Sequence, residues 1–323
     1  MTNPTNDDDA KRAKLRELLP FLRGNIRGQD HALPRIASLL TRGELGLTKR
    51  SRPRGSFLFL GPTGVGKTQV TIAFTEFLMG LDHLFRFDMS EYQTQESIGV
   101  LLGGRLGERG TLALARDKHD CGTLLCDEIE KAHPRVLDIF LQILDAARVT
   151  MANGETLDLS GFYIVFTSNI AGAELLELQH SSFATMERHV LVRAQQAMRP
   201  ELYARISEKL VFQKLTYDVQ LEIAHLLLAQ EVEFLGAKGH CIEPAENVLP
   251  FLVRRGFHPR LGARPLRDVV EKVIGDAVAA DVLAGGNGTG MLVVREDENR
   301  LPSPGGSSPS PCRGRACSCR GVD

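Results

Sequence analysis

A glycine-rich run that contains a lysine and a threonine, GPTGVGKT at residues 61–68, has the spacing needed to bind a chain of phosphates. It fits the pattern G-x-x-x-x-G-K-[ST], follows an apolar segment and precedes a helical pattern, which is the context that this motif requires. Glycines let backbone N–H groups turn toward phosphate oxygens, and the next helix adds positive potential at its N-terminus. The alternative is a glycine-rich turn with an incidental lysine. The residues predicted to hold a nucleotide here are Gly61, Pro62, Thr63, Gly64, Val65, Gly66, Lys67 and Thr68.

Hydrolysis of a bound nucleotide also needs a carboxylate that binds the metal and a group that positions water. TLLCDE at residues 123–128 ends an apolar segment with both. Asp127 is predicted to bind Mg²⁺ together with Thr68, and Glu128 to act as the base that orients water. The alternative is a solvated acidic strand end. Asn169 ends a further apolar segment, where its amide would hold the attacking water or sense the γ-phosphate unless it is only a turn residue.

Strands that alternate with helices are expected to position these side chains up to about residue 213. Apolar runs typical of strands buried on both faces lie at 56–60, 84–87, 123–126 and 163–167. In a sheet of parallel strands, ligands bind beyond the carboxyl ends. From Thr216 the pattern changes to long helical runs with one late strand candidate at 291–294. We therefore predict an α/β fold, a P-loop parallel sheet with flanking helices, plus a small and mainly helical C-terminal domain.

The predicted domain boundaries follow these changes of pattern. They are an N-terminal helical extension at 1–23, a large nucleotide-binding domain at 24–215, a small helical domain at 216–297 and a disordered tail at 298–323. The tail is rich in Pro, Ser, Gly and Arg, a composition that favours disorder over a metal site formed by its three cysteines.

Composition excludes several broad classes of protein. The 323 residues carry 40 acidic and 39 basic side chains, so no overall charge indicates nucleic acid or a membrane as partner. The N-terminus is polar and acidic, and no stretch approaches eighteen uninterrupted apolar residues. Six scattered cysteines are not typical of a secreted disulfide framework. We expect a soluble, cytoplasmic protein.

Several further motifs, taken in order, make the chain resemble the AAA+ module of Clp-type ATPases, most closely the second ATPase ring of the ClpB and ClpA chaperones. The resemblance covers about Ile26 to Gly286. It implies the AAA+ fold with its helical lid domain, hydrolysis of ATP with Mg²⁺, and a homo-oligomer that is hexameric. The motifs that carry it are GSFLFLGPTGVGKT, FDMSEY, CDEIEKAHPRV, LQILDAARVT, FTSN, RPELYARI and HPRLGARPL.

The resemblance implies roles that spacing alone does not give. Arg205, in RPELYARI, matches the arginine finger that reaches the nucleotide of the neighbouring subunit. Arg264, in GARPL, matches the sensor arginine that couples the γ-phosphate to the angle of the small domain. Ile26 and Arg27 match the segment that packs around adenine, although the family usually has two aliphatic residues there. For either Arg205 or Arg264 the alternative is a surface or interdomain salt bridge.

The segment LLGGRLGERG, residues 101–110, lies where the family carries a pore-facing loop that grips a translocating polypeptide. The matching residues are Gly104, Arg105, Leu106 and Gly107, and Arg105 stands in place of the family's aromatic residue. No aromatic residue lies between Tyr92 and Asp127. An aromatic ring gives a sequence-tolerant grip, whereas arginine gives charge and directed hydrogen bonds. We interpret this segment as an altered pore loop; the alternative is a degenerate loop with no substrate role.

Two hypotheses for function remain open. The favoured one is a Clp-type, chaperone-like ATPase that remodels a protein client or partner complex as a ring. The other is a nucleotide-switched ring scaffold or assembly module that threads no substrate. The short tripeptide that docks relatives onto a peptidase is absent between Asn169 and Arg199, so no proteolytic partner is expected. A nucleic-acid motor is the least favoured hypothesis, because it rests only on arginines of the loop and the tail.

Overall fold

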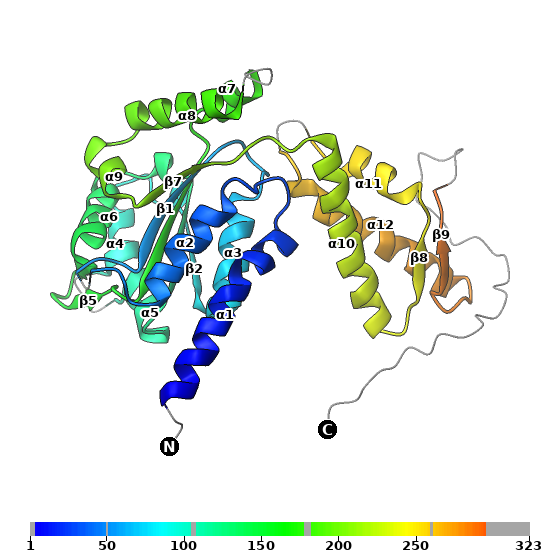
Figure 1. Cartoon of the computed structure of the whole chain (residues 1–323), viewed down its shortest axis with the longest axis horizontal. Helices are drawn as coiled ribbons and strands as arrows, with labels where there is room; N and C mark the ends of the chain where they lie inside the picture. Colours follow the sequence, from blue (N-terminus) through cyan, green and yellow to red (C-terminus); the bar gives the residue numbers. More distant parts are fainter. Residues whose placement is uncertain (1–3, 50, 105–107, 178–181, 259–260, 295–323) are drawn as a thin grey trace. The chain divides into compact units, whose positions relative to one another are not determined.

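The computed structural model describes residues 4–49, 51–104, 108–177, 182–258 and 261–294 (Figure 1). The described residues form two compact units, the first comprising those up to residue 219 with residues 261–262 and the second comprising residues 220–258 with 263–294. Within the described part of the chain, no helix is both long and apolar enough to cross a membrane.

The first unit alternates strands with helices along the chain. Its strands are β1 (Gly55–Leu60), β2 (Leu84–Asp88), β3 (Gly122–Asp127), β4 (Arg148–Thr150), β5 (Thr156–Asp158), β6 (Phe162–Ser168) and β7 (Glu208–Val211). Its helices are α1 (Pro4–Asn25), α2 (Leu33–Glu44), α3 (Lys67–Leu78), α4 (Ser97–Leu102), α5 (Thr111–Lys118), α6 (Pro134–Ala146), α7 (Gly172–Glu177), α8 (Phe183–Ala197) and α9 (Pro200–Arg205), with short 3-10 helices η1 (Leu81–His83), η2 (Met89–Glu91) and η3 (Ile129–Lys131).

A five-stranded parallel sheet in the order β2-β3-β6-β1-β7 forms the centre of this unit. Every residue of β1, β3 and β6 is buried, as their continuous apolar runs predict. The edge strand β7 has the sequence EKLV and was not predicted, because its two charged residues interrupt the apolar run that indicates a buried strand. The predicted α/β class and parallel sheet are confirmed.

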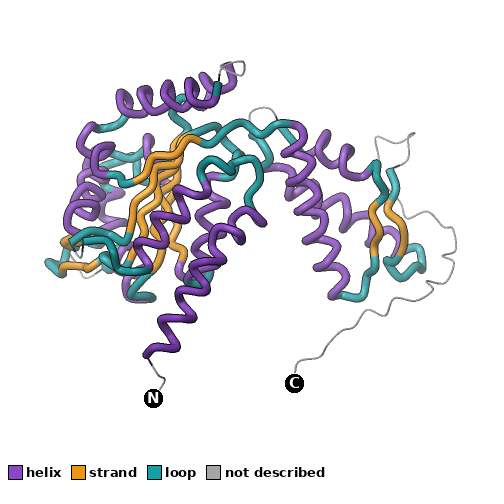
Figure 2. The backbone as a smooth tube through the Cα atoms, in the orientation of Figure 1, coloured by secondary structure: helices purple, strands orange, loops and turns teal. Residues whose placement is uncertain are grey.

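Helices cover both faces of the sheet (Figure 2). Successive side chains of a strand point to opposite faces, so the apolar runs of the central strands place apolar side chains on both faces. Leu58 and Leu60 belong to a core that includes Phe140 of α6 and Val190 of α8. Phe57, the residue before Leu58, points to the other face, where its ring centroid lies 6.0 Å from that of Phe74 in α3. Burial on both faces fixes the sheet as the rigid frame of the unit.

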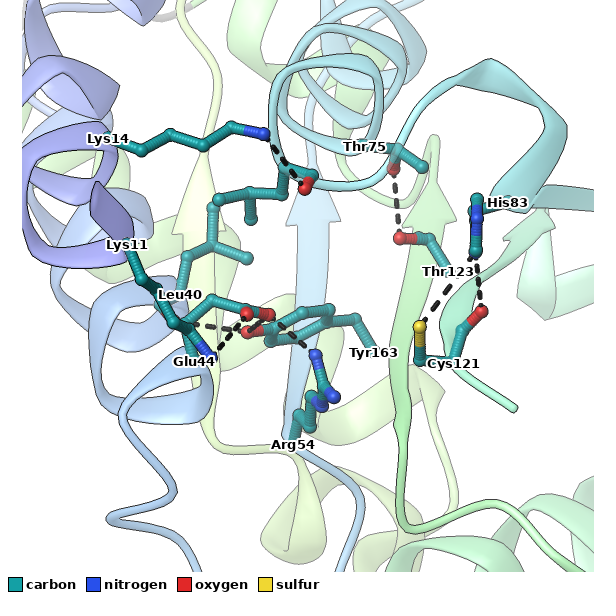
Figure 3. A network of polar contacts seen from close by, with 11 residues as sticks. Lys11, Lys14, Leu40, Glu44, Arg54, Thr75, His83, Cys121, Thr123 and Tyr163 are labelled. Atoms are coloured by element: carbon teal, nitrogen blue, oxygen red, sulfur yellow. Dashed lines mark hydrogen bonds and ion pairs between the residues drawn. The ribbon is translucent and has the colours of Figure 1, made fainter. Parts of the chain in front are cut away.

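The amino-terminal edge of the sheet is tied to α1 and α2 by a polar network (Figure 3). The buried Tyr163 hydroxyl donates to the Leu40 carbonyl and to Glu44 Oε1, each at 3.0 Å. Arg54 Nη1 lies 2.7 Å and Lys11 Nζ 3.5 Å from the same carboxylate. Burial, together with the adjacent Glu44, raises the pKa of Tyr163, so the phenol stays a donor.

The second unit is mainly helical, as predicted, and has its own core. It contains α10 (Tyr217–Ala237), which begins in the first unit, β8 (Ile242–Pro244), α11 (Val248–Gly256), α12 (Arg264–Leu283) and β9 (Gly290–Leu292). A Cβ at Gly256 would lie 2.8 Å from Leu266 Cα, so glycine allows α11 and α12 to approach closely. The parallel pair β8 and β9 packs beside these helices.

Candidate functional site

The turn between β1 and α3 contains three glycines with positive φ: Gly61 at 145°, Gly64 at 74° and Gly66 at 102°. Other residues rarely adopt these angles, so the glycines permit the tight turn. A Cβ at Gly61 would meet the Phe212 carbonyl oxygen at 2.7 Å, whereas beside Gly66 the space is open. Gly66 is the N-cap of α3, and no described side chain caps that helix. The turn therefore presents uncapped N–H groups, which suits a phosphate.

Lys67, the first residue of α3, folds back over this turn. Its Nζ donates to the carbonyls of Gly61 at 2.6 Å and Pro62 at 2.8 Å, and to Asn169 Oδ1 at 2.8 Å. Burial lowers the pKa of Lys67 to about 8, and the carboxylate of Glu130 opposes this shift most strongly. The ammonium group is thus held where a phosphate chain above the turn would be in reach.

The Asp127 carboxylate, at the end of β3, has both oxygens engaged. Oδ1 accepts from Thr167 Oγ1 at 2.9 Å and from Thr68 Oγ1 at 3.3 Å. Oδ2 lies 2.6 Å from Nε of Arg86, an exposed residue of the neighbouring strand β2. Thr68 and Asp127, predicted as metal ligands, therefore lie side by side. Arg86 and Thr167 were not predicted as site residues. The one signal for Arg86 is that a charged side chain interrupts the otherwise apolar strand LFRF.

Glu128 lies between Asp127 and η3 in a left-handed backbone conformation, with φ 57° and ψ 52°. This conformation is uncommon for a residue with a side chain, and it ends the extended backbone of β3 where η3 begins. Glu128 Oε1 accepts from Asn169 Nδ2 at 2.9 Å, and Oε2 lies 2.5 Å from Lys131 Nζ. The Glu128 backbone N–H donates to Thr167 Oγ1 at 3.1 Å. One threonine hydroxyl therefore positions both acidic residues.

Gln29, which the sequence did not indicate as a site residue, holds the turn between β1 and α3 through hydrogen bonds of its side-chain amide. Its side chain is fully buried, and Nε2 donates to the carbonyls of Val65 at 3.2 Å and Gln213 at 3.0 Å. Oε1 accepts from the Gln213 N–H at 3.0 Å. The amide thus joins the turn between β1 and α3 to the segment after β7. A glutamine two residues beyond Arg27 carries no sequence signal that separates it from a surface residue.

Other predicted residues lie elsewhere. Ile26 is buried after α1, and the half-buried Arg27 donates to the Arg23 carbonyl. Arg205 is exposed at the end of α9, paired with Asp145 of α6.

The remaining predicted residues fall outside this geometry. Arg264 is the exposed first residue of α12, in the second unit. In the loop segment, Gly104 N–H donates to the Glu108 carbonyl at 3.1 Å, whereas Arg105, Leu106 and Gly107 lie outside the described residues, as does the tail.

The donor set fits a nucleotide with its metal. The turn offers N–H groups, and Thr68 and Asp127 offer two neighbouring oxygens, the ligand type that Mg²⁺ prefers alongside phosphate and water. Glu128 and Asn169 offer a carboxylate and an amide within hydrogen-bond distance of each other, which can orient a water molecule.

Comparison with known proteins assigns both parts of the chain. The family described as "AAA domain (Cdc48 subfamily)" matches residues 52–209, and the "C-terminal, D2-small domain, of ClpB protein" matches residues 215–293.

Curated relatives agree with this assignment. The chaperone protein ClpB of Aquifex aeolicus is 39% identical over 295 residues, which cover 87% of this chain and 29% of that protein. ClpB 1 of Nostoc is 34% identical, covering 91% of this chain and 34% of the relative. A ClpA homologue, named as an ATP-binding subunit of a Clp protease, from Porphyra purpurea is 37% identical, covering 84% and 35%. The chain thus spans about a third of the length of these relatives. With its parallel sheet, its glycine-rich turn before α3 and its helical second unit, the chain belongs to the Clp-type AAA+ ATPases and is most similar to their second ATPase module.

Proposed function

We propose that this chain hydrolyses ATP with Mg²⁺ at the turn between β1 and α3. The observation that carries the proposal is the convergence of Lys67 and Glu128 on the two ends of one amide, that of Asn169. The cation, the base and the amide come from the segments that follow three separate strands, β1, β3 and β6, and they meet at one point. A chance acidic strand end would not be expected to bond to the P-loop lysine through a shared partner.

Each residue then has a distinct task. Lys67 would exchange the carbonyls of Gly61 and Pro62 for the β- and γ-phosphates. Thr68 and Asp127 would hold Mg²⁺, which neutralises charge on the phosphates when bound. Glu128 would accept a proton from the attacking water, and Asn169 would fix the position of that carboxylate and of the water.

We further propose that the active unit is a ring, with Arg205 reaching the site of the neighbouring subunit. Arg205 is exposed, and its partners among the described residues, Asp145 and the Glu201 carbonyl, belong to α6 and α9 rather than to the site. An exposed ion pair contributes little stability, so releasing Asp145 to bind a phosphate costs little. By similarity to the ClpB relatives the ring is a hexamer, and Arg264 would report the nucleotide state to the second unit.

The favoured biological role is remodelling of a protein client or partner complex in the cytoplasm. The similarity to chaperone proteins ClpB supports this role. The described cysteines Cys121, Cys126 and Cys241 are all free thiols, which agrees with a reducing compartment.

A second candidate function, a nucleotide-switched scaffold, is favoured by Arg105 in place of the pore-loop aromatic. Arg105→Ala separates the two: it should abolish remodelling by a motor that grips its client there and leave the assembly of a scaffold intact.

The proposal is tested by comparing ATP turnover and ATP binding in wild type and Glu128→Gln. We expect Glu128→Gln to bind Mg·ATP with wild-type affinity and to lose turnover about 10²–10⁴-fold, because only the base is changed. Glu76→Gln, at an exposed position in the last turns of α3, is the control and should keep most of the turnover. Equal turnover in wild type and Glu128→Gln would refute the assignment.

A further inference from the structure

Three potential metal ligands meet at the amino-terminal edge of the sheet, away from the nucleotide site. Asp82 and His83 belong to η1, just before β2, and His119 follows α5, just before β3. Because β2 and β3 are parallel, their starting residues lie at the same edge. One ligand atom from each of the three side chains lies within 4.8 Å of the others.

The hydrogen bond of His83 fixes which of its nitrogens is available. His83 Nδ1 lies 2.9 Å from the Cys121 carbonyl oxygen, and Figure 3 shows the two residues facing each other. A carbonyl can only accept, so Nδ1 carries the hydrogen, and the Nε2 of the neutral ring keeps its lone pair. Histidine ligands of metals commonly donate their second N–H to a carbonyl in this way.

His119 presents a second nitrogen to the same point. Its Nε2 is buried and has no hydrogen-bond partner among the described atoms, although Asp82 Oδ2 lies 3.2 Å away. Asp82 Oδ2 is also 4.0 Å from His83 Nε2, and the two imidazole rings stack with centroids 3.7 Å apart. A carboxylate and two imidazoles therefore converge without a well-aligned protein donor between them. A buried nitrogen such as His119 Nε2 is normally satisfied, so a bound cation or a proton is expected at this point.

We propose that Asp82, His83 and His119 bind a divalent transition metal, with Zn²⁺ as the ion that best fits the donor set. Imidazole nitrogen and carboxylate oxygen are ordinary zinc ligands, and three protein ligands leave a fourth position for water. The 3.2 Å between Asp82 Oδ2 and His119 Nε2 is close to the edge of a zinc tetrahedron, about 3.3 Å for bonds of about 2.0–2.1 Å.

Binding requires a small rearrangement of the rings. Their planes are inclined by 25°, and the inclination must increase before both Nε2 lone pairs can point at one ion. The exposed Asp82 carboxylate can follow this change by rotating its side chain. Cys121 is not proposed as a ligand. Its Sγ lies 3.9 Å from His83 Nδ1, the nitrogen that donates to the carbonyl, and so it lies beside the nitrogen of the ring that does not bind the ion.

The site is distinct from the nucleotide site and independent of the proposed ATPase. β2 and β3 run from it toward Asp127, and strands of this length span roughly 16–20 Å. A bound ion would link η1 to the junction between α5 and β3. Its expected effect is therefore on thermal stability and not on the chemistry at Lys67.

The experiment uses the full-length chain with Cys312, Cys317 and Cys319 changed to serine, so that tail thiols cannot bind the probe. After metal removal, Zn²⁺ is titrated against a chromophoric chelator. We expect one Zn²⁺ per chain and a higher Tm with the metal. Asp82→Asn and His119→Ala should each weaken binding by more than about 100-fold, a larger loss than that of an outer partner. His189→Ala, which removes a surface histidine paired with the single carboxylate of Glu174, is the matched control and should change nothing.

Cobalt(II) absorption identifies the ligands directly. We expect visible bands of a tetrahedral ion without thiolate charge transfer, and the same spectrum for Cys121→Ser. Unchanged Zn²⁺ affinity in both Asp82→Asn and His119→Ala, or no binding to wild type, would overturn the proposal. Asp82 is exposed, so Asp82→Asn is expected to fold, and unaltered ATP turnover in that variant would verify it.

Discussion

The side-chain amide of Asn169 donates to the carboxylate of Glu128, with 2.9 Å between Nδ2 and Oε1. The other end of the same amide accepts from Lys67 Nζ at 2.8 Å. This one side chain therefore connects the P-loop lysine to the proposed base. A nucleotide that draws Lys67 toward its phosphates would release Oδ1 of the amide, so occupancy of the turn can be sensed at Glu128.

Replacing Asn169 by alanine should lower kcat for ATP by about 100-fold, the loss typical of one positioned donor at a reacting group. The affinity for Mg·ATP should change much less, because the turn itself is intact. Steady-state kinetics and equilibrium binding of a slowly hydrolysed ATP analogue separate the two effects. Ser168→Ala is a neighbouring control, and if it lowers kcat as much as Asn169→Ala, the specific role of the amide is excluded.

The hydroxyl of Thr167 bonds to both acidic residues, through Asp127 Oδ1 and the Glu128 N–H. Thr167→Val keeps the shape of the side chain and removes both hydrogen bonds. We expect activity or metal affinity to fall about 10–100-fold, as for other partners that orient metal ligands. Thr167→Ser keeps the hydroxyl and should retain activity. The Mg²⁺ dependence of ATP turnover measures both variants, and a fully active Thr167→Val would show that the hydroxyl is dispensable.

The lowered pKa of Lys67 predicts a pH dependence of nucleotide binding. With a pKa of about 8, the side chain loses its proton above pH 8 in the nucleotide-free protein, whereas bound phosphates favour the charged form. Binding should therefore be independent of this group below pH 8 and weaken by up to about tenfold per unit above it.

Calorimetry in buffers of different ionisation enthalpy checks the sign. At pH 9 we expect uptake of close to one proton when ATP binds, and at pH 7 none from Lys67. Equal proton uptake at both pH values would contradict the lowered pKa.

Much of this architecture could be predicted from sequence because its signals are local. The apolar runs of β1, β3 and β6 are explained by burial on both faces of the sheet. The glycines of the turn are explained by their positive φ angles. The edge strand β7 was missed because a strand with one neighbour can carry charged residues.

The supporting contacts of the site were not predictable in the same way. Gln29 contacts Val65 and Gln213 across 36 and 184 residues of sequence, and Arg86 reaches Asp127 from a different strand. Such pairs are set by the order of strands in the sheet, which no local pattern encodes. The roles of Arg205 and Arg264 stay predictions, because they depend on a neighbouring subunit and on the second unit.

The central claim, that ATP is hydrolysed between subunits with Arg205 acting on the neighbouring site, is tested most directly by mixing two inactive variants. Glu128→Gln lacks the base but keeps its finger, and Arg205→Ala keeps the base but lacks the finger, which is worth about 10³–10⁵ in rate. After co-assembly in equal amounts, about a quarter of the interfaces of a ring would combine an intact base with an intact finger. We predict ATP turnover far above that of either variant alone. Turnover no higher than the average of the two separate variants, in confirmed mixed rings, would contradict the account.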